Sequence, residues 1–304
     1  MSNDNMGAGR DSYTTGSVTS HDGTTIGYRQ LGQGPGLVVV HGTMSSGQTH
    51  TQLGEALASA FTVYLLDRRG RGLSGPPGDD YSLQKEVEDL DAVLARTGAQ
   101  NVFAVSSGAI VTLQHALTRP VIRKAAIFEP PLLLPSAAEL MARYDRELSE
   151  GKIAAALVTG MVGAQMGPAI MRAMPRWLLE RLTSMMMSGE DKKAKADDVT
   201  FRKLAPTMRY DGQLILEVGR RLEPFRAVQA EVLLIGGSKS PAYLKEGHDA
   251  LGKILPHVRR VELPGLDHAA SWNRDRGGEP QLVAEELLRF FGRESEAGRP
   301  AWET

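Results

Sequence analysis

Residues 101–116 read NVFAVSSGAIVTLQHA, an apolar run that ends in two serines and a glycine and continues directly into a helix-like stretch. Two interpretations are open for Ser106 and Ser107. Either one of the two serines is a nucleophile on a sharp strand-to-helix turn, or both serines simply turn the chain, because Ser and Gly are common turn residues. The spacing of small residues around the two serines, and the rest of the chain, decide between these interpretations.

A serine nucleophile on such a turn is held in a strained conformation, so the flanking positions of the motif must be small. Ala104 and Gly108 satisfy this spacing around Ser106. Centring the motif on Ser107 would place Val105 where a small residue is needed. Ser106 is therefore the predicted nucleophile, although Ala104 stands where glycine is commoner.

The composition is that of an ordinary globular protein with a sizeable core. The chain has 304 residues, of which 41% are hydrophobic and 23% charged. Its net charge of -1 gives no reason to expect nucleic acid or an anionic membrane as a partner. The absence of cysteine excludes disulfides, thiolate metal sites and a cysteine nucleophile. No stretch is apolar for long enough to span a bilayer, so we expect a cytoplasmic protein. We also expect a small-molecule substrate and no cofactor or metal.

Strand-like and helix-like segments alternate along most of the chain, which favours an α/β fold with a mainly parallel sheet. Asp22 and Gly23 lie between two short strand-like runs and predict a hairpin turn. The apolar strand-like runs are GLVVVHG, FTVYLLDRRGRG, NVFAV, RKAAIFEPP, AEVLLIGG and VRRVELPG. Helical patterns cover residues 52–60, 83–96, 107–117, 242–255 and 280–291.

The segment 136–226 interrupts this alternation with helical patterns and no convincing strand, so it is predicted to be a helical cap. Nine of the 12 methionines lie there, including Met185, Met186 and Met187. They either line an adaptable apolar pocket or fill a small helical core, and both are common uses of methionine. The predicted organisation is thus a disordered tail at 1–16, a core formed by 17–135 and 227–292, the cap, and a frayed end at 293–304.

Several motifs together resemble the α/β-hydrolase fold superfamily. They occur in the family's order from about residue 17 to residue 292 and are VVVHGTMSSG, YLLDRRGRGLSG, AVSSGA, FEPPLL, LLIGGSKSP and LPGLDH. The resemblance is strong on both sides of the cap and weak inside it. It implies a parallel sheet with a nucleophile, a base and an acid at its carboxyl edge. The arginines and Ser74 of DRRGRGLSG are expected to be structural.

The resemblance also implies the base and the oxyanion hole. His268 lies after the last predicted strand and before the last helix, where the family's catalytic histidine stands. A serine hydroxyl needs such a base to remove its proton. The backbone N–H groups of Thr43 and Ser107 are expected to form the oxyanion hole, and His41 is expected to be structural. The remaining five histidines are interpreted as surface or helix residues.

The acid departs from the family's pattern. Most members carry a carboxylate after the strand represented here by EVLLIGG, but the sequence that follows is SKSP. Either the acid has been lost, or Glu129 at the end of the preceding strand replaces it, as in a group of haloalkane dehalogenases. A carboxylate at the end of such an apolar strand needs a partner, and His268 is the obvious one. Glu129 could instead bind backbone amides of the Pro130-Pro131 turn, and Asp267 ranks below Glu129 because it would point elsewhere.

These residues predict a serine hydrolase that acts on a carboxylic ester or lactone of a small to medium apolar substrate. A fold of this kind hosts many reactions, so two alternatives stay open. One is lyase, haloperoxidase or carbon–carbon hydrolysis chemistry at the same Ser–His pair. The other is a cyclase or ligand binder that uses the pocket for its shape, and the missing late acid favours it. The oligomeric state is not predicted.

Overall fold

The computed structural model describes residues 13–167 and 169–292. A sheet of eight strands runs through the molecule in the order β1-β2-β4-β3-β5-β6-β7-β8. The strands β3 to β8 run parallel to one another, and β4 pairs antiparallel with β2 on its other side, so the predicted α/β architecture with a mainly parallel sheet is confirmed. The strands are β1 (Thr14–Thr19), β2 (Thr25–Leu31), β3 (Gly36–Val40), β4 (Thr62–Leu66), β5 (Asn101–Val105), β6 (Lys124–Phe128), β7 (Glu231–Gly237) and β8 (Val258–Leu263).

The two N-terminal strands form the predicted hairpin at one edge of the sheet. β1 pairs antiparallel with β2, and Thr19 faces Thr25 across the turn. Gly23 occupies this turn with a φ of 85°, a conformation that glycine adopts without steric cost. Because β1 already begins at Thr14, the disordered tail predicted for 1–16 is wrong over residues 14–16. Residues 1–12 and the predicted frayed end at 293–304 lie outside the described residues.

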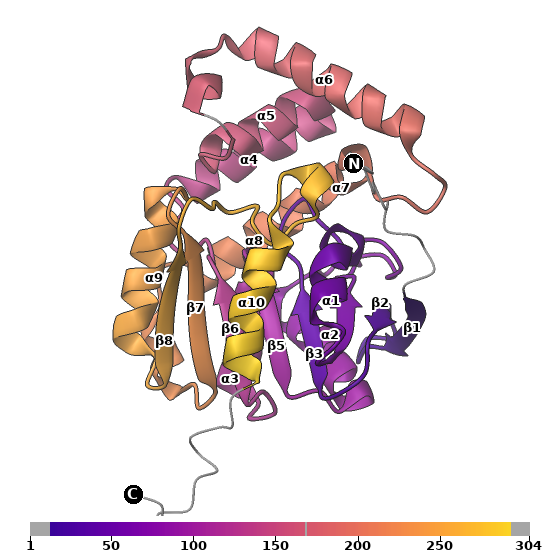
Figure 1. The fold of residues 1–304 in the computed structure, drawn as a ribbon. Coiled ribbons are helices and arrows are strands. Elements are labelled where there is room, and N and C mark those ends of the chain that lie inside the picture. Colours follow the sequence, from indigo (N-terminus) through magenta and orange to yellow (C-terminus); the bar gives the residue numbers. More distant parts are fainter. Residues whose placement is uncertain (1–12, 168, 293–304) are drawn as a thin grey trace, which may run out of the picture.

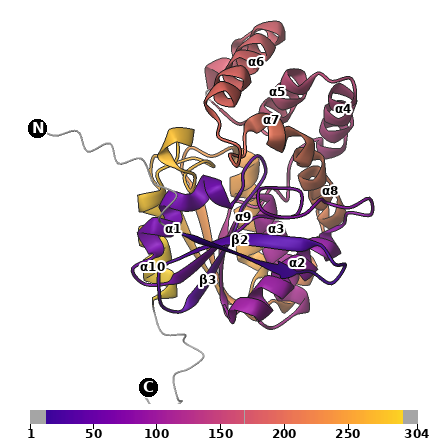
Figure 2. The ribbon, with the colours of Figure 1, turned by 90° about the vertical axis from the view of Figure 1, so that its right-hand side faces the viewer.

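Helices cover both faces of the sheet because the central strands are apolar on both sides. One face packs against α1 (Thr51–Leu57) and α10 (Pro280–Phe291), whose leucines, valine and phenylalanines join the strand side chains in one apolar cluster. The other face packs against α2 (Leu83–Thr97), α3 (Ser107–Thr118) and α9 (Ala242–Ile254). The two layers are visible on opposite sides of the sheet in Figure 2.

A layer of helices lies over one end of the sheet (Figure 1). Between β6 and β7 the described residues form helices and no strand. The helices α4, α5 and α6 stand farthest from the sheet, whereas α8 descends beside α3 (Figures 1 and 2). They are α4 (Ala137–Ser149), α5 (Ile153–Gly163), η3 (Ala169–Ala173), α6 (Arg176–Lys193), α7 (Phe201–Leu204), η4 (Ala205–Thr207), α8 (Met208–Val218) and η5 (Glu223–Ala227).

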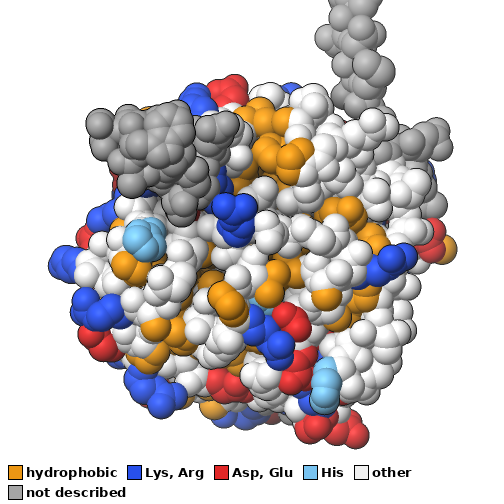
Figure 3. Space-filling model, turned by 90° about the horizontal axis from the view of Figure 1, so that it is seen from below, with side chains coloured by type: hydrophobic (Ala, Val, Ile, Leu, Met, Phe, Trp, Pro, Cys, Tyr) orange, Lys and Arg blue, Asp and Glu red, His pale blue; other side chains and the backbone are white. Residues whose placement is uncertain are grey.

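The face opposite the helical layer carries both signs of charge. Figure 3 shows Lys and Arg side chains interspersed with Asp and Glu around this face, with apolar side chains between them. Such a mixture does not form the single-sign basic surface that binds nucleic acid. Within residues 13–167 and 169–292, no helix is both long and apolar enough to cross a bilayer.

Candidate active site

Ser106 lies on the turn between β5 and α3 with a φ of 55° and a ψ of -123°. Positive φ is uncommon for a residue with a side chain and marks a constrained turn. The backbone N–H of Ser106 donates to the Phe128 carbonyl oxygen at 2.8 Å, which fixes the turn to the end of β6. The sharp strand-to-helix turn expected at Ser106 is therefore present.

The small residues around this turn are required by close approach of the backbone. A Cβ atom on Gly108 would lie 2.4 Å from the His41 carbonyl oxygen, so no larger residue fits there without displacing the main chain. A Cβ atom on Gly42 would lie 2.6 Å from the Cβ of Ser106. The loop after β3 and the turn after β5 thus pack directly on one another.

Glu129 ends β6, and one of its carboxylate oxygens lies 2.7 Å from Nδ1 of His268. The other oxygen accepts the Gly237 backbone N–H at 2.7 Å, where β7 ends. The expected approach of Glu129 to His268 is present, and the backbone amide that Glu129 binds belongs to β7 rather than to the Pro130-Pro131 turn. Asp267 is turned elsewhere, since its Oδ1 accepts the Ala269 backbone N–H at 2.9 Å.

The environment of Glu129 keeps its carboxyl group ionised. Its side chain is only 1% exposed. Burial acts to raise the pKa of Glu129, but the hydrogen bond and charge of His268 and the Gly237 amide outweigh it, so the pKa lies below its usual value. A carboxylate is therefore available at neutral pH to orient His268 and to stabilise its protonated form.

Ser106, His268 and Thr43 line one cavity of about 720 Å³ beneath the helical layer. Most of its remaining wall comes from the helices and loops of the segment between β6 and β7. The cavity is of a size that binds small organic ligands. Five cap methionines contribute to the wall, namely Met141, Met161, Met166, Met186 and Met208.

Some methionines of the cap line the cavity, and others fill a small helical core. Met187 is buried in a small apolar cluster with Leu157 and Leu204. Met186 lines the cavity, whereas its neighbour Met185 is 63% exposed. Neighbouring residues of one helix thus face the core, the cavity and the surface.

The backbone positions expected to form the oxyanion hole flank Ser106. Ser107 is the first residue of α3, where backbone N–H groups have no partner within the helix. Thr43 follows β3 in the loop that packs on the Ser106 turn. The hydroxyls of Thr43 and Ser107 lie 3.3 Å apart, so the two segments meet at this point.

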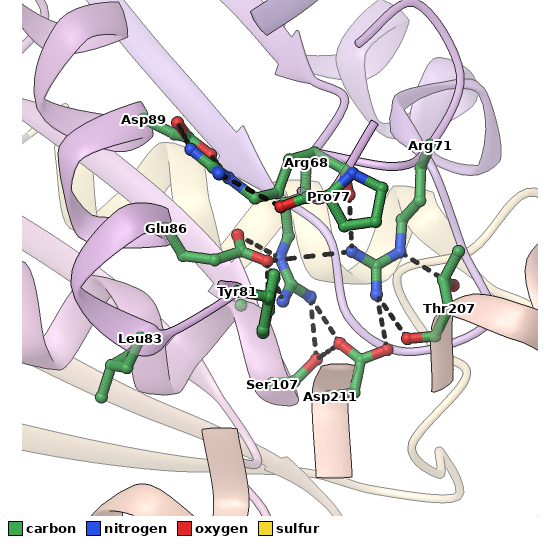
Figure 4. A network of polar contacts seen from close by, with 12 residues as sticks. Arg68, Arg71, Pro77, Tyr81, Leu83, Glu86, Asp89, Ser107, Thr207 and Asp211 are labelled. Atoms are coloured by element: carbon green, nitrogen blue, oxygen red, sulfur yellow. Dashed lines mark hydrogen bonds and ion pairs between the residues drawn. The ribbon is translucent and has the colours of Figure 1, made fainter. Parts of the chain in front are cut away.

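A buried network of charges lies behind the Ser106 turn (Figure 4). Arg68 donates to both carboxylate oxygens of Glu86, at 2.9 and 2.8 Å, and to Asp211 Oδ1 at 2.8 Å. Arg71 donates to Asp211 Oδ2 at 2.6 Å. The Ser107 hydroxyl donates to Asp211 Oδ1 at 2.7 Å and accepts from Arg68 at 3.0 Å. The network therefore joins the turn, the loop after β4, α2 and the cap helix α8.

This network has two guanidinium groups and two carboxylates, so its buried charges balance. Burial acts to raise the pKa of Asp211, but the charges of Arg71 and Arg68 outweigh it and hold the pKa below its usual value. Arg68 and Arg71 of the turn after β4 are buried in these ion pairs, which agrees with the structural role expected for them. Asp211 was not identified from the sequence, because it lies 143 residues from Arg68 within a helix and carries no local motif.

His41 and His50 are buried and bind the backbone. Nε2 of His41 accepts the Arg68 backbone N–H at 3.1 Å, and Nδ1 of His50 lies 2.9 Å from the Ser271 carbonyl oxygen. These contacts agree with a structural role for His41. Among residues 13–167 and 169–292, no cluster of three or more His, Cys, Asp or Glu side chains is arranged to hold a metal ion.

The model of the Alpha/beta hydrolase family matches residues 37–286, which span both sides of the cap. This chain belongs to the alpha/beta hydrolase family. Its relatives include the 3-hydroxybutyrate-oligomer hydrolase of Cupriavidus necator, 26% identical over 78% of this chain and 83% of the relative. Another is the pimeloyl-[acyl-carrier protein] methyl ester esterase of Xanthomonas campestris pv. campestris, 24% identical over 86% of this chain and 96% of the relative.

Solved structures of hydrolases share the fold. An alpha/beta hydrolase from Sphaerobacter thermophilus is 28% identical and superimposes with a TM-score of 0.74 over 91% of this chain and all of that one. A thermophilic esterase from Thermogutta terrifontis, 16% identical over 91% of this chain and 99% of that one, has a TM-score of 0.68 and shows the fold alone. The chain is thus a hydrolase of the alpha/beta hydrolase family.

Proposed function

We propose that this hydrolase cleaves a carboxylic ester or lactone through a covalent acyl-enzyme on Ser106. The observation that carries the proposal is the 2.7 Å hydrogen bond between Glu129 and His268 in a cavity that Ser106 also lines. A nucleophile, a base and an acid that orients the base are the parts that acyl transfer requires. The relatives named above as an oligomer hydrolase and a methyl ester esterase support an ester as the bond attacked.

Each side chain has a defined part in the proposed reaction. Glu129 binds Nδ1 of His268, which leaves Nε2 free to accept the proton of the Ser106 hydroxyl. The Ser106 oxygen attacks the carbonyl carbon, and the Thr43 and Ser107 amides bind the resulting oxyanion. His268 returns the proton to the departing alcohol oxygen as the carbon–oxygen bond breaks. A water molecule, deprotonated by His268, then attacks the acyl group and releases the acid and Ser106.

The cavity supports a small to medium, largely apolar acyl group. Methionines, leucines and glycine from α4, α5 and α6 form its wall above Ser106. Methionine side chains are flexible and polarisable, so they adapt to acyl chains of different shape. Within a cavity of about 720 Å³, a substrate of drug-like size fits beneath the cap.

Labelling with a fluorophosphonate probe tests the proposal, because the probe reacts only with an activated serine. The adduct is expected on Ser106 when the labelled protein is digested and mapped by mass spectrometry. Ser106→Ala is expected to lose labelling and to lose ester turnover by roughly a thousandfold or more. Ser107→Ala is the matched control, since it keeps the backbone N–H that the oxyanion requires.

Two results would contradict the proposal. Full labelling of Ser106→Ala would remove Ser106 as the nucleophile. A folded wild-type protein that neither reacts with the probe nor turns over esters and lactones would support the non-hydrolytic alternatives instead.

A further inference from the structure

A second histidine, His248, contacts the backbone of Glu129. His248 belongs to α9 and is only 6% exposed. Its Nε2 accepts the backbone N–H of Glu129 at 3.1 Å. The sequence around this histidine indicates only a surface or helix residue, because nothing near it in the chain points to a site.

The backbone of Glu129 is in a conformation that needs such a contact. Its φ is 46°, in the left-handed region that residues with a side chain seldom adopt. This conformation directs the carboxylate toward both His268 and the Gly237 amide. Rotation about the N–Cα bond of Glu129 to an ordinary negative φ would turn its side chain relative to its N–H, so the contacts to His248 and His268 would not both be kept.

β7 leaves room for this arrangement. A Cβ atom on Gly236 would lie 3.0 Å from a Glu129 carboxylate oxygen and 3.2 Å from the His248 ring. The strand thus passes close to both side chains, and glycine allows them to meet there. β6, β7 and α9 each contribute to the position of the same carboxylate.

His248 can accept a hydrogen bond only while its ring is neutral. Burial lowers the pKa of His248 to about 4, and the charge of Glu129 opposes this shift. The other charged or titratable groups that act on the ring are Arg260, Asp249 and His268. At neutral pH the ring is therefore uncharged, with its proton on Nδ1 and a lone pair on Nε2 facing Glu129.

We infer that His248 is a positioning residue for Glu129: it binds the Glu129 N–H and holds the carboxylate in line with His268. The inference rests on the proposed function, in which Glu129 is the catalytic acid. The inference also bears on the missing acid after β7. Here β7 supplies the Gly237 amide and α9 supplies the His248 imidazole, and both hold an acid that comes from the end of β6. His248 is not among the residues that line the cavity, and it acts on His268 through Glu129.

A double-mutant cycle between His248 and Glu129 tests the inference. His248→Met removes the acceptor while keeping a side chain of similar length. His248→Gln places an oxygen the same number of bonds from Cα as Nε2 and serves as the matched control. We expect His248→Met to lower kcat by roughly ten- to a hundredfold with little change in KM, as for loss of one buried hydrogen bond. His248→Gln is expected to recover most of that loss.

The Glu129→Gln background separates positioning from a general packing role. If His248 acts through Glu129, His248→Met has little further effect on kcat once Glu129→Gln has removed the carboxylate. An equal loss of kcat in both backgrounds, or a His248→Gln variant no better than His248→Met, would overturn the inference while leaving the triad intact. A Glu129→Gln single variant as active as wild type would instead overturn the assigned acid, and the inference with it.

Discussion

Ser106 and Glu129 are two non-glycine residues with positive φ, 55° and 46°, and they stand at the ends of adjacent parallel strands. Backbone strain of this kind persists only where neighbouring contacts hold it. Ser106 is held by its N–H bond to the Phe128 carbonyl, and Glu129 by its contacts to His248, Gly237 and His268. The strained residues are thus also the proposed nucleophile and acid.

Replacing Glu129 by glutamine is expected to lower kcat by about a hundredfold to ten-thousandfold while the fold is kept. The amide cannot stabilise a protonated His268, and it can hold the ring in the wrong tautomer. Steady-state kinetics on a chromogenic ester measures the loss. Asp267→Asn is the control, because this exposed acid next to His268 accepts a hydrogen bond from the Ala269 amide. If Asp267→Asn caused the larger loss, Glu129 would not be the acid.

The sequence predicted residues of the site where the chain carries a local motif. Ser106 followed from the spacing of Ala104 and Gly108, and Glu129 from an apolar strand that ends in an acid. His248 and Asp211 had no such signal. Each lies in a helix far along the chain from the residue it binds, and only the packing of the folded molecule brings the pairs together.

The helices of the cap have two roles in the structure: some of their side chains pack the cap's own apolar core, and others line the cavity. The exposed, cavity-lining and buried positions of Met185, Met186 and Met187 follow one another on α6. Met161 on α5 also lines the cavity. The length of acyl chain that fits is therefore expected to depend on a few side chains of α5 and α6.

Met161→Phe is expected to reduce kcat/KM for longer-chain esters by about tenfold relative to an acetyl ester, because the larger ring fills space that a long chain would occupy. The same comparison applies to Met186→Phe. The measurement is the ratio of kcat/KM values across a series of p-nitrophenyl esters of increasing chain length.

Met185→Phe is the matched control for this series, since Met185 is largely exposed and does not line the cavity. Its chain-length profile is expected to equal that of the wild type. An unchanged profile in Met161→Phe and Met186→Phe as well would mean that these methionines only pack the cap.

The sheet was easier to predict than the cap, for a physical reason. Buried parallel strands are short apolar runs that end at glycine or proline, as β6 does before Pro130 and β7 at Gly237. The helices α4, α5 and α6 begin after Ser136, Lys152 and Pro175 without a side-chain capping hydrogen bond. Without that signal the sequence indicated a helical region but not where each helix starts.

Buried neutral histidines make the free energy of unfolding of this protein depend on pH. Burial lowers the pKa of His50 and of His248 to about 4, and that of His41 well below its usual value. The unfolded chain binds protons at these histidines below about pH 6.5, whereas the folded chain does not until lower pH. Stability is therefore expected to fall as the pH decreases from about 6.5 to about 4.

Each of these histidines is expected to contribute about 1.4 kcal/mol of destabilisation per pH unit in that window. Denaturant unfolding at several pH values measures the slope. His50→Asn keeps a donor for the Ser271 carbonyl and is expected to flatten the slope. Equal slopes in the wild type and in His50→Asn would show that His50 does not titrate as described.

The ion pairs around Asp211 determine which part of the inserted cap segment, residues 136–226, can be exchanged between related proteins. Asp211 on α8 is one of two carboxylates that neutralise Arg68 and Arg71 behind the Ser106 turn. A truncation that removed the whole insertion would leave an uncompensated cation in the interior, which costs several kcal/mol. A graft limited to residues 137–193 would replace α4, α5 and α6 and keep Asp211. The insertion therefore has an outer part that can be exchanged, whereas α8 is bound through Asp211 to the loop after β4 and to Ser107.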